Sequence, residues 1–118
     1  MVKVKMYGIL KKYAGLEEIE VPLNNRSIKL KSLLDKLFTL LPKGFKDTLI
    51  DPELNNPKPN IIILINDKEI SVLNELETIV RDTDEVTLLP VAHGGASFLH
   101  LIKSRFYFLL LFSTKILV

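Results

Sequence analysis

The sequence contains no cysteine, which excludes disulfides, thiolate metal sites and a cysteine nucleophile. It also lacks an apolar signal-peptide core at its beginning, because residues 1–7 alternate in polarity and carry Lys3 and Lys5. Without these features, we expect a cytoplasmic protein. Its 118 residues are enough for one small domain with a modest core.

The chain also lacks a strong excess of one charge in its main body. All 14 acidic residues lie within residues 1–95, together with 13 of the 16 basic ones. A nucleic-acid-binding domain usually presents a clustered basic face, which this near-neutral body does not provide. We therefore expect no direct binding of nucleic acid.

No pattern of metal ligands is complete. Asp82, Asp84 and Glu85 lie close together, but the glycine and the spaced glutamate of a calcium loop do not follow them. A solvated polar turn is the better interpretation. The two histidines, His93 and His100, are isolated in sequence, so we predict no metal site.

The apolar spacing predicts an α+β domain with a sheet and one main helix. Residues 28–41 have leucines at helical spacing, with Ser27 as the expected N-cap and Pro42 at the end. Gly8 interrupts the first strand, and a short helical segment is expected at 9–14, before Gly15. A short turn is expected at 44–50. Strands are expected at 2–6, 17–21, 61–65 and 86–91, with shorter ones at 69–71 and 78–80, and 51–60 is expected to be a loop.

Two consecutive glycines, Gly94 and Gly95, follow the last predicted strand after the linker 92–93. Glycine has no side chain and wide backbone freedom, so such an arm can pass through a narrow channel. From this local context alone, the pair could equally form a turn between the strand and a helix made by the residues that follow.

The order of these motifs resembles the ubiquitin-like β-grasp sulfur carriers, a family that includes the ubiquitin-related modifier, the small subunit of molybdopterin synthase and the archaeal small modifier proteins. The resemblance lies in Lys58-Pro59 with 61–67, in 73–76, in the turn 81–86, and in 89–95 with its terminal diglycine. It covers residues 1–95 and implies a β-grasp domain over that range, with a mixed sheet and one main helix.

The resemblance also implies a mechanism in which this chain is a co-substrate and contributes no catalytic residue of its own. A partner enzyme related to the ubiquitin-activating enzymes would use ATP to adenylate the carboxylate of Gly95, with Gly94 and His93 shaping the arm. The product would be a thiocarboxylate, or an isopeptide with a lysine such as Lys11 or Lys12. No cofactor would be bound by the chain itself. Expected partners are a sulfur donor or the large subunit of a synthase, serving tRNA thiolation, molybdopterin synthesis or protein modification.

The last predicted strand offers apolar side chains to such a partner. Because strand side chains alternate between two faces, at least one face belongs to the core. Either Leu88 and Pro90 or Leu89 and Val91 are therefore expected to contact the partner, and the sequence does not distinguish the two pairs. Lys43 and Lys46 are further lysines that could accept a modifier, although exposed lysines are ordinary surface.

Residues 96–118 form an apolar extension that departs from the family pattern. Of the 21 residues 98–118, 14 are apolar, and they must be hidden or removed because exposing each costs about 1.5–3 kcal/mol. Gly95 has no free carboxylate while the extension is attached. A protease could cut after Gly95, residues 98–118 could lie in a membrane interface, or they could pack on the domain or on a second copy; the natural chain could also end elsewhere.

A membrane span is disfavoured, because Lys103, Arg105 and Lys115 interrupt the apolar run, which needs about 20 residues. The functional alternative to a carrier is a non-catalytic β-grasp interaction domain. In that case Gly94–Gly95 would be a hinge, and the extension would be a permanent membrane or dimerisation element.

Overall fold

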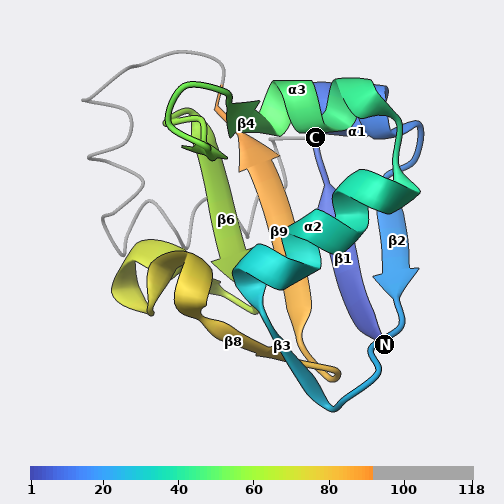
Figure 1. The fold of residues 1–118 in the computed structure, drawn as a ribbon, viewed down its shortest axis with the longest axis vertical. Helices are drawn as coiled ribbons and strands as arrows, with labels where there is room; N and C mark the ends of the chain where they lie inside the picture. Colours follow the sequence, from blue (N-terminus) through green and yellow to red (C-terminus); the bar gives the residue numbers. More distant parts are fainter. Residues whose placement is uncertain (92–118) are drawn as a thin grey trace.

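The computed structural model describes residues 1–91 and has a five-stranded sheet at its centre (Figure 1). The strand order is β2-β1-β9-β6-β7. The four longer strands begin and end within one residue of the predicted positions, which confirms them. The strands are β1 (Val2–Met6), β2 (Glu18–Val21), β6 (Ile61–Ile65), β7 (Lys68–Glu69) and β9 (Glu85–Pro90).

The sheet is mixed, with one parallel pair at its centre. The first and last strands, β1 and β9, run parallel, with Val4 opposite Val86 and Met6 opposite Leu88. Antiparallel partners flank them: β2 pairs with β1, and β6 pairs with both β9 and β7. This topology, with the crossing helix described next, is the predicted β-grasp arrangement.

One face of the sheet packs against α2 (Leu30–Leu40), which crosses it obliquely (Figure 1). Leucines recur along the helix at spacings of three and four residues, and they form one buried stripe. Alternate residues of the strands meet this stripe. The shared core contains Leu30, Leu33, Leu34 and Leu37 of α2, Val2, Val4 and Met6 of β1, Ile61, Ile63 and Ile65 of β6, and Val86 and Leu88 of β9.

The predicted N-cap of this helix is wrong. Ser27 lies in the short strand β3 (Ser27–Lys29), where it pairs with Arg81 of β8 (Ile79–Arg81), and the helix begins at Leu30. Lys29 is at the N-cap and makes no side-chain capping bond. The amide of Leu30 instead donates to the carbonyl of Thr78 at 2.8 Å. A contact distant in sequence thus takes the place of the local cap.

Two further helices, α1 (Gly8–Ala14) and α3 (Lys43–Leu49), contact each other at the end of the sheet where β9 finishes (Figure 1). The expected stop of α1 is confirmed, because Gly15 has a left-handed φ of 80° that glycine adopts easily. In the region of the expected loop 51–60, two strands of two residues each pair with one another: β4 (Ile50–Asp51) and β5 (Asn56–Pro57). Two short 3-10 helices follow β7: η1 (Ile70–Val72) and η2 (Glu75–Glu77).

Within residues 1–91, no helix has the length and apolar character needed to cross a membrane. The predicted membrane contact through 98–118 and the predicted extension 96–118 lie outside the described residues.

Candidate functional site

The candidate site is the end of β9, from which the diglycine segment continues. Backbone hydrogen bonds hold this end on both sides. The amide of Tyr7 donates to the carbonyl of Leu88 at 3.2 Å, and the amide of Val91 donates to the carbonyl of Asn60 at 2.8 Å. Pro90, which has no amide hydrogen, is placed opposite Ile61 in the ladder. The chain is therefore fixed up to Val91, four residues before Gly95.

Gly8 contacts this end of β9 from the side of α1. It has a left-handed φ of 57°, and a Cβ added there would lie 3.0 Å from Cγ of Pro90. Both the backbone conformation and the close approach to Pro90 favour glycine at this position. Gly8 was expected only to interrupt the first strand, so its role next to Pro90 was missed. The signal that could have revealed it is a glycine directly after a strand.

The structure separates the predicted partner residues by face. Leu88 is fully buried in the core, so its side chain is not available to a partner in the folded domain. Pro90 is half-buried. Leu89 and Val91 lie outside the core cluster and point to the other face of the sheet. Leu89 and Val91 are buried as well, so partner contact by either predicted pair stays a prediction. His93, Gly94 and Gly95 lie outside the described residues.

The acidic turn before β9 is organised by hydrogen bonds. Asp84 accepts from the amide of Arg81 at 2.8 Å and from the side-chain amide of Asn66 at 3.0 Å. Glu85 forms an ion pair with Lys5 at 3.4 Å. These contacts connect Asp84 and Glu85 to neighbouring parts of the domain, which agrees with the predicted polar turn. Residues 1–91 contain no group of three side chains arranged to hold a metal ion.

The four lysines named as candidate modification sites are exposed on the two helices beside the end of β9. Lys11 of α1 pairs with Glu17 at 3.1 Å, and the ammonium of Lys46 in α3 lies 5.4 Å from the centre of the Phe38 ring. These are ordinary surface contacts, and acceptance of a modifier by Lys11, Lys12, Lys43 or Lys46 stays a prediction.

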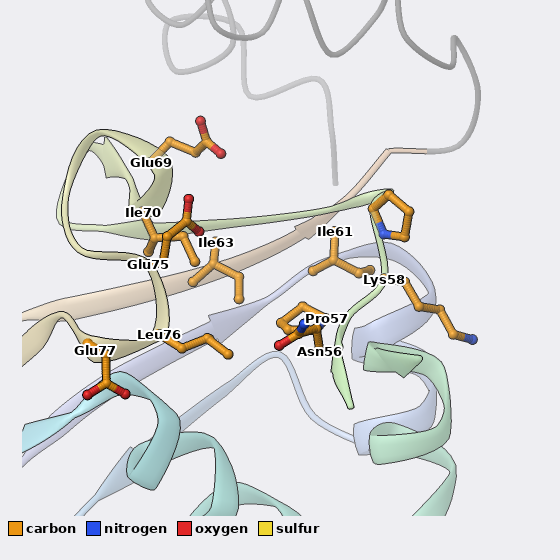
Figure 2. Close-up of a pocket in the computed structure, with 11 residues that line it drawn as sticks. Asn56, Pro57, Lys58, Ile61, Ile63, Glu69, Ile70, Glu75, Leu76 and Glu77 are labelled. Atoms are coloured by element: carbon orange, nitrogen blue, oxygen red, sulfur yellow. The ribbon is translucent and has the colours of Figure 1, made fainter. Parts of the chain in front are cut away.

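A groove of about 540 Å³ lies at the edge of the sheet beside β6 (Figure 2). Apolar side chains form its floor, and three glutamates, with Lys58, stand at its rim. The lining residues of this groove include no hydroxyl, thiol or imidazole side chain. The floor includes Ile61, Ile63, Ile70 and Leu76, and the acidic rim is Glu69, Glu75 and Glu77.

The mixed sheet packed on one long helix, with Gly94 and Gly95 following the central strand β9 in the sequence, defines a ubiquitin-like β-grasp domain. The comparison with known families agrees with that class. The sequence model of the Urm1 (Ubiquitin related modifier) family matches residues 2–95, so the chain belongs to this family.

Three of the relatives are similar to this chain over almost their whole length. Ubiquitin-related modifier 1 of Schizosaccharomyces pombe is 33% identical over 98 residues, covering 80% of this chain and 98% of that protein. Small archaeal modifier protein 1 of Methanosarcina acetivorans, solved in solution, is 31% identical, with a TM-score of 0.65 over 80% of this chain and 95% of that one. In the Amycolatopsis orientalis BexX/CysO complex, the matching chain is 25% identical, with a TM-score of 0.66 over 80% of this chain and all of that one.

The protein is therefore a ubiquitin-like sulfur carrier and protein modifier. Proteins of this family work with activating enzymes and sulfur-transfer partners, and the relatives mark this chain as a carrier on which enzymes act and not as an enzyme. The alternative of a pure interaction domain with a permanent apolar extension is not favoured.

Proposed function

We propose that the carboxylate of Gly95 is the group on which this carrier is activated. The observation that carries the proposal is that the family match ends at Gly95, four residues after β9 is fixed by the hydrogen bond from Val91 to Asn60. Residues 92–95 can extend about 14 Å from that point. Such a reach, without bulky side chains at Gly94 and Gly95, suits an arm that enters the active site of another enzyme.

The proposed activation needs a free carboxylate, so a protease first hydrolyses the bond between Gly95 and Ala96. One carboxylate oxygen then attacks the α-phosphorus of ATP in the partner enzyme, and pyrophosphate leaves. The acyl adenylate is a better acyl donor than the resonance-stabilised carboxylate. Sulfide from the partner system displaces AMP and gives the thiocarboxylate directly. A persulfide of the partner system displaces AMP to form an acyl disulfide, which a second thiol then cleaves to release the thiocarboxylate and leave a disulfide. A lysine amine that displaces AMP instead forms an isopeptide.

In this scheme the chain binds no cofactor, and ATP is used by the adenylating partner. The thiocarboxylate sulfur serves a tRNA-thiolating system or a molybdopterin synthase with its large subunit. In conjugation, a lysine of another protein accepts the acyl group instead. All three outputs share the chemistry at Gly95. We place the partner contact at Leu89 and Val91, because they lie on the sheet face opposite the core cluster to which Leu88 belongs.

Exchange of radioactive pyrophosphate into ATP tests the proposal, using the adenylating enzyme purified from the native cells. A chain ending at Gly95 should support exchange. The full chain should support it at least about tenfold less, because its Gly95 carboxylate is held in a peptide bond. Gly95→Ala in the chain ending at residue 95 is the matched variant, and we expect it to lose exchange while still binding the enzyme.

Equal exchange with the full chain and with the chain ending at Gly95 would refute activation at this carboxylate. If Gly95→Ala binds the enzyme and supports exchange as the unchanged chain does, the glycine has no special role in activation. Of these two results, only the first would make the interaction-domain alternative the better explanation.

A further inference from the structure

The two short helices at the end of β9 carry an excess of positive charge. Together α1 and α3 contain four lysines and one aspartate, a net charge of +3. Residues 1–95 have 13 basic and 14 acidic side chains in all, so the remainder has nine against thirteen, a net charge of −4. These two helices are therefore positive within a domain whose remainder is negative, and they lie where β9 finishes (Figure 1).

Three of these lysines have no carboxylate partner in the part of the chain that the structure describes. Lys11 pairs with Glu17 at 3.1 Å. In contrast, Lys12, Lys43 and Lys46 are exposed and take part in none of the ion pairs among the described residues. Exposed charges of one sign attract the opposite charge and steer association, so these lysines favour a partner with an acidic surface.

Two apolar side chains of α1 are exposed beside these lysines. Ile9 is 47% exposed and Tyr13 is 44% exposed, and their spacing of four residues places them on one face of the helix. The Tyr13 ring lies against α3, because a Cβ added at Gly44 would be 2.7 Å from its Cδ1. The ammonium of Lys12 lies 5.9 Å from the centre of the ring. Tyrosine is among the residues that contribute most to binding when a partner covers them. We call this surface the arm-base face; its members are Ile9, Lys12, Tyr13, Lys43 and Lys46.

We propose that the arm-base face docks the adenylating enzyme that receives Gly95, and that the enzyme meets this face with carboxylates around an apolar contact. The inference rests on the proposed function, in which Gly95 enters the active site of another enzyme. Gly94 and Gly95 have no side chains, so the arm alone does not distinguish this carrier from another one with the same ending. Discrimination between carriers has to come from the folded domain near the arm.

The geometry places the arm-base face within reach of that enzyme. The first residue of α1, Gly8, contacts Pro90, and a helix of seven residues is about 10 Å long. The four residues 92–95, when extended, reach about 14 Å beyond Val91. An enzyme that holds Gly95 in its active site therefore has its surface close to the end of β9. Both α1, which contacts β9, and α3, which contacts α1, lie beside that end.

Charge reversal tests the electrostatic part of the proposal. Calorimetric titration without ATP measures the Kd of the adenylating enzyme, purified from the native cells, for the chain ending at Gly95. The double variant Lys12→Glu, Lys43→Glu should raise Kd about tenfold at about 50 mM salt, and much less at about 500 mM, where screening is stronger. The matched control is Lys31→Glu with Lys68→Glu, the same change of charge at exposed lysines outside α1 and α3. It should raise Kd less than about twofold.

Tyr13→Ala tests the apolar part. We expect Kd to rise about tenfold at both salt concentrations, because the burial of an aromatic ring does not depend on screening. Val72→Ala, at a side chain that is 71% exposed on η1, is the matched control and should bind as the unchanged chain does. Circular dichroism establishes that each variant is folded. If neither variant differs from its control, the proposal is overturned; if only one differs, the other half of the proposal is wrong.

The titration is separate from the test of activation, because it needs no ATP. If both variants bind more weakly than their controls while the full chain supports exchange as well as the chain ending at Gly95, docking stands and activation at Gly95 is refuted. If only the chain ending at Gly95 supports exchange but the variants bind as their controls do, activation stands and docking at this face is refuted. No measurable binding of the unchanged chain would also refute docking.

An anionic membrane is another surface that attracts exposed lysines. Co-sedimentation of the same chains with phosphatidylglycerol-containing vesicles separates the two partners. We expect enzyme binding that depends on the arm-base face and vesicle binding that does not. Loss of vesicle binding in the lysine double variant, with enzyme binding equal to that of the control pair, would show a membrane contact and overturn the proposal.

Discussion

Gly8 and Pro90 are in close approach where the first helix meets the last strand: a Cβ at Gly8 would lie 3.0 Å from Cγ of Pro90. The contact joins the beginning of α1 to the point from which the diglycine arm continues. Together with the hydrogen bonds at Tyr7 and Val91, it fixes the base of the arm in the domain. A carrier whose end must enter another enzyme benefits from such a base, because fewer arm conformations have to be restricted on binding.

Gly8→Ala should lower the free energy of unfolding by about 2–3 kcal/mol, because alanine disfavours the left-handed φ and its Cβ meets Pro90. Gly15→Ala is the matched control. Gly15 also has a positive φ, but a Cβ there would meet nothing within 4 Å, so we expect a loss of only about 1 kcal/mol. Urea unfolding measures both values. Equal losses would show that the approach to Pro90 contributes nothing.

Asn66 should stabilise the turn that precedes β9. It has a positive φ of 55°, its side chain donates to Asp84 at 3.0 Å, and its side-chain oxygen accepts from the amide of Glu85 at 3.1 Å. Asn66→Ala should cost about 2 kcal/mol, since it loses both bonds and strains the backbone. Asn66→Gly loses the same bonds without the strain and should cost less. If both variants unfold at the urea concentration of the unchanged chain, the turn bonds have no net effect.

Glu77 should titrate below the usual range of a glutamate. The hydrogen bond from the Lys29 ammonium, at 2.9 Å, and then the charge attraction of Lys29 lower the pKa of this exposed carboxyl. The stabilisation by this pair is therefore present above the unfolded pKa and is lost as the pH falls through the folded one. NMR titration should show the Glu77 pKa rising in Lys29→Met. An unchanged titration in that variant would refute the assignment.

The spacing of apolar residues predicted the strands, in which side chains alternate between two faces, and the main helix, in which leucines recur every three or four residues. The run 61–65 is buried throughout in β6, as its continuous β-branched and leucine sequence indicated. The predictions were wrong where a contact between residues distant in sequence determines the local structure. Ser27 has the chemistry of an N-cap, yet its strand pairs with β8, 50 or more residues away, and Thr78 satisfies the first helical amide. The sequence order does not reveal that pairing.

The candidate site shows the same division. Alternation predicted that one of two residue pairs on the last strand would face the core, and the register with β1 and β6 identifies Leu88 as the core member. The contact of Gly8 with Pro90 depends on how α1 packs against β9, so no local motif reports it. Helix α3 was expected only as a short turn, because Gly44 weakens the helical pattern, although Phe45 and Leu49 are buried one turn apart.

The intact mass of the protein isolated from its native cells tests the central claim, which is that Gly95 becomes the functional end of a sulfur carrier. The account predicts a chain ending at Gly95, with a fraction in which sulfur replaces one carboxylate oxygen. A full-length chain in every cellular fraction, with residues 96–118 still attached, would contradict it.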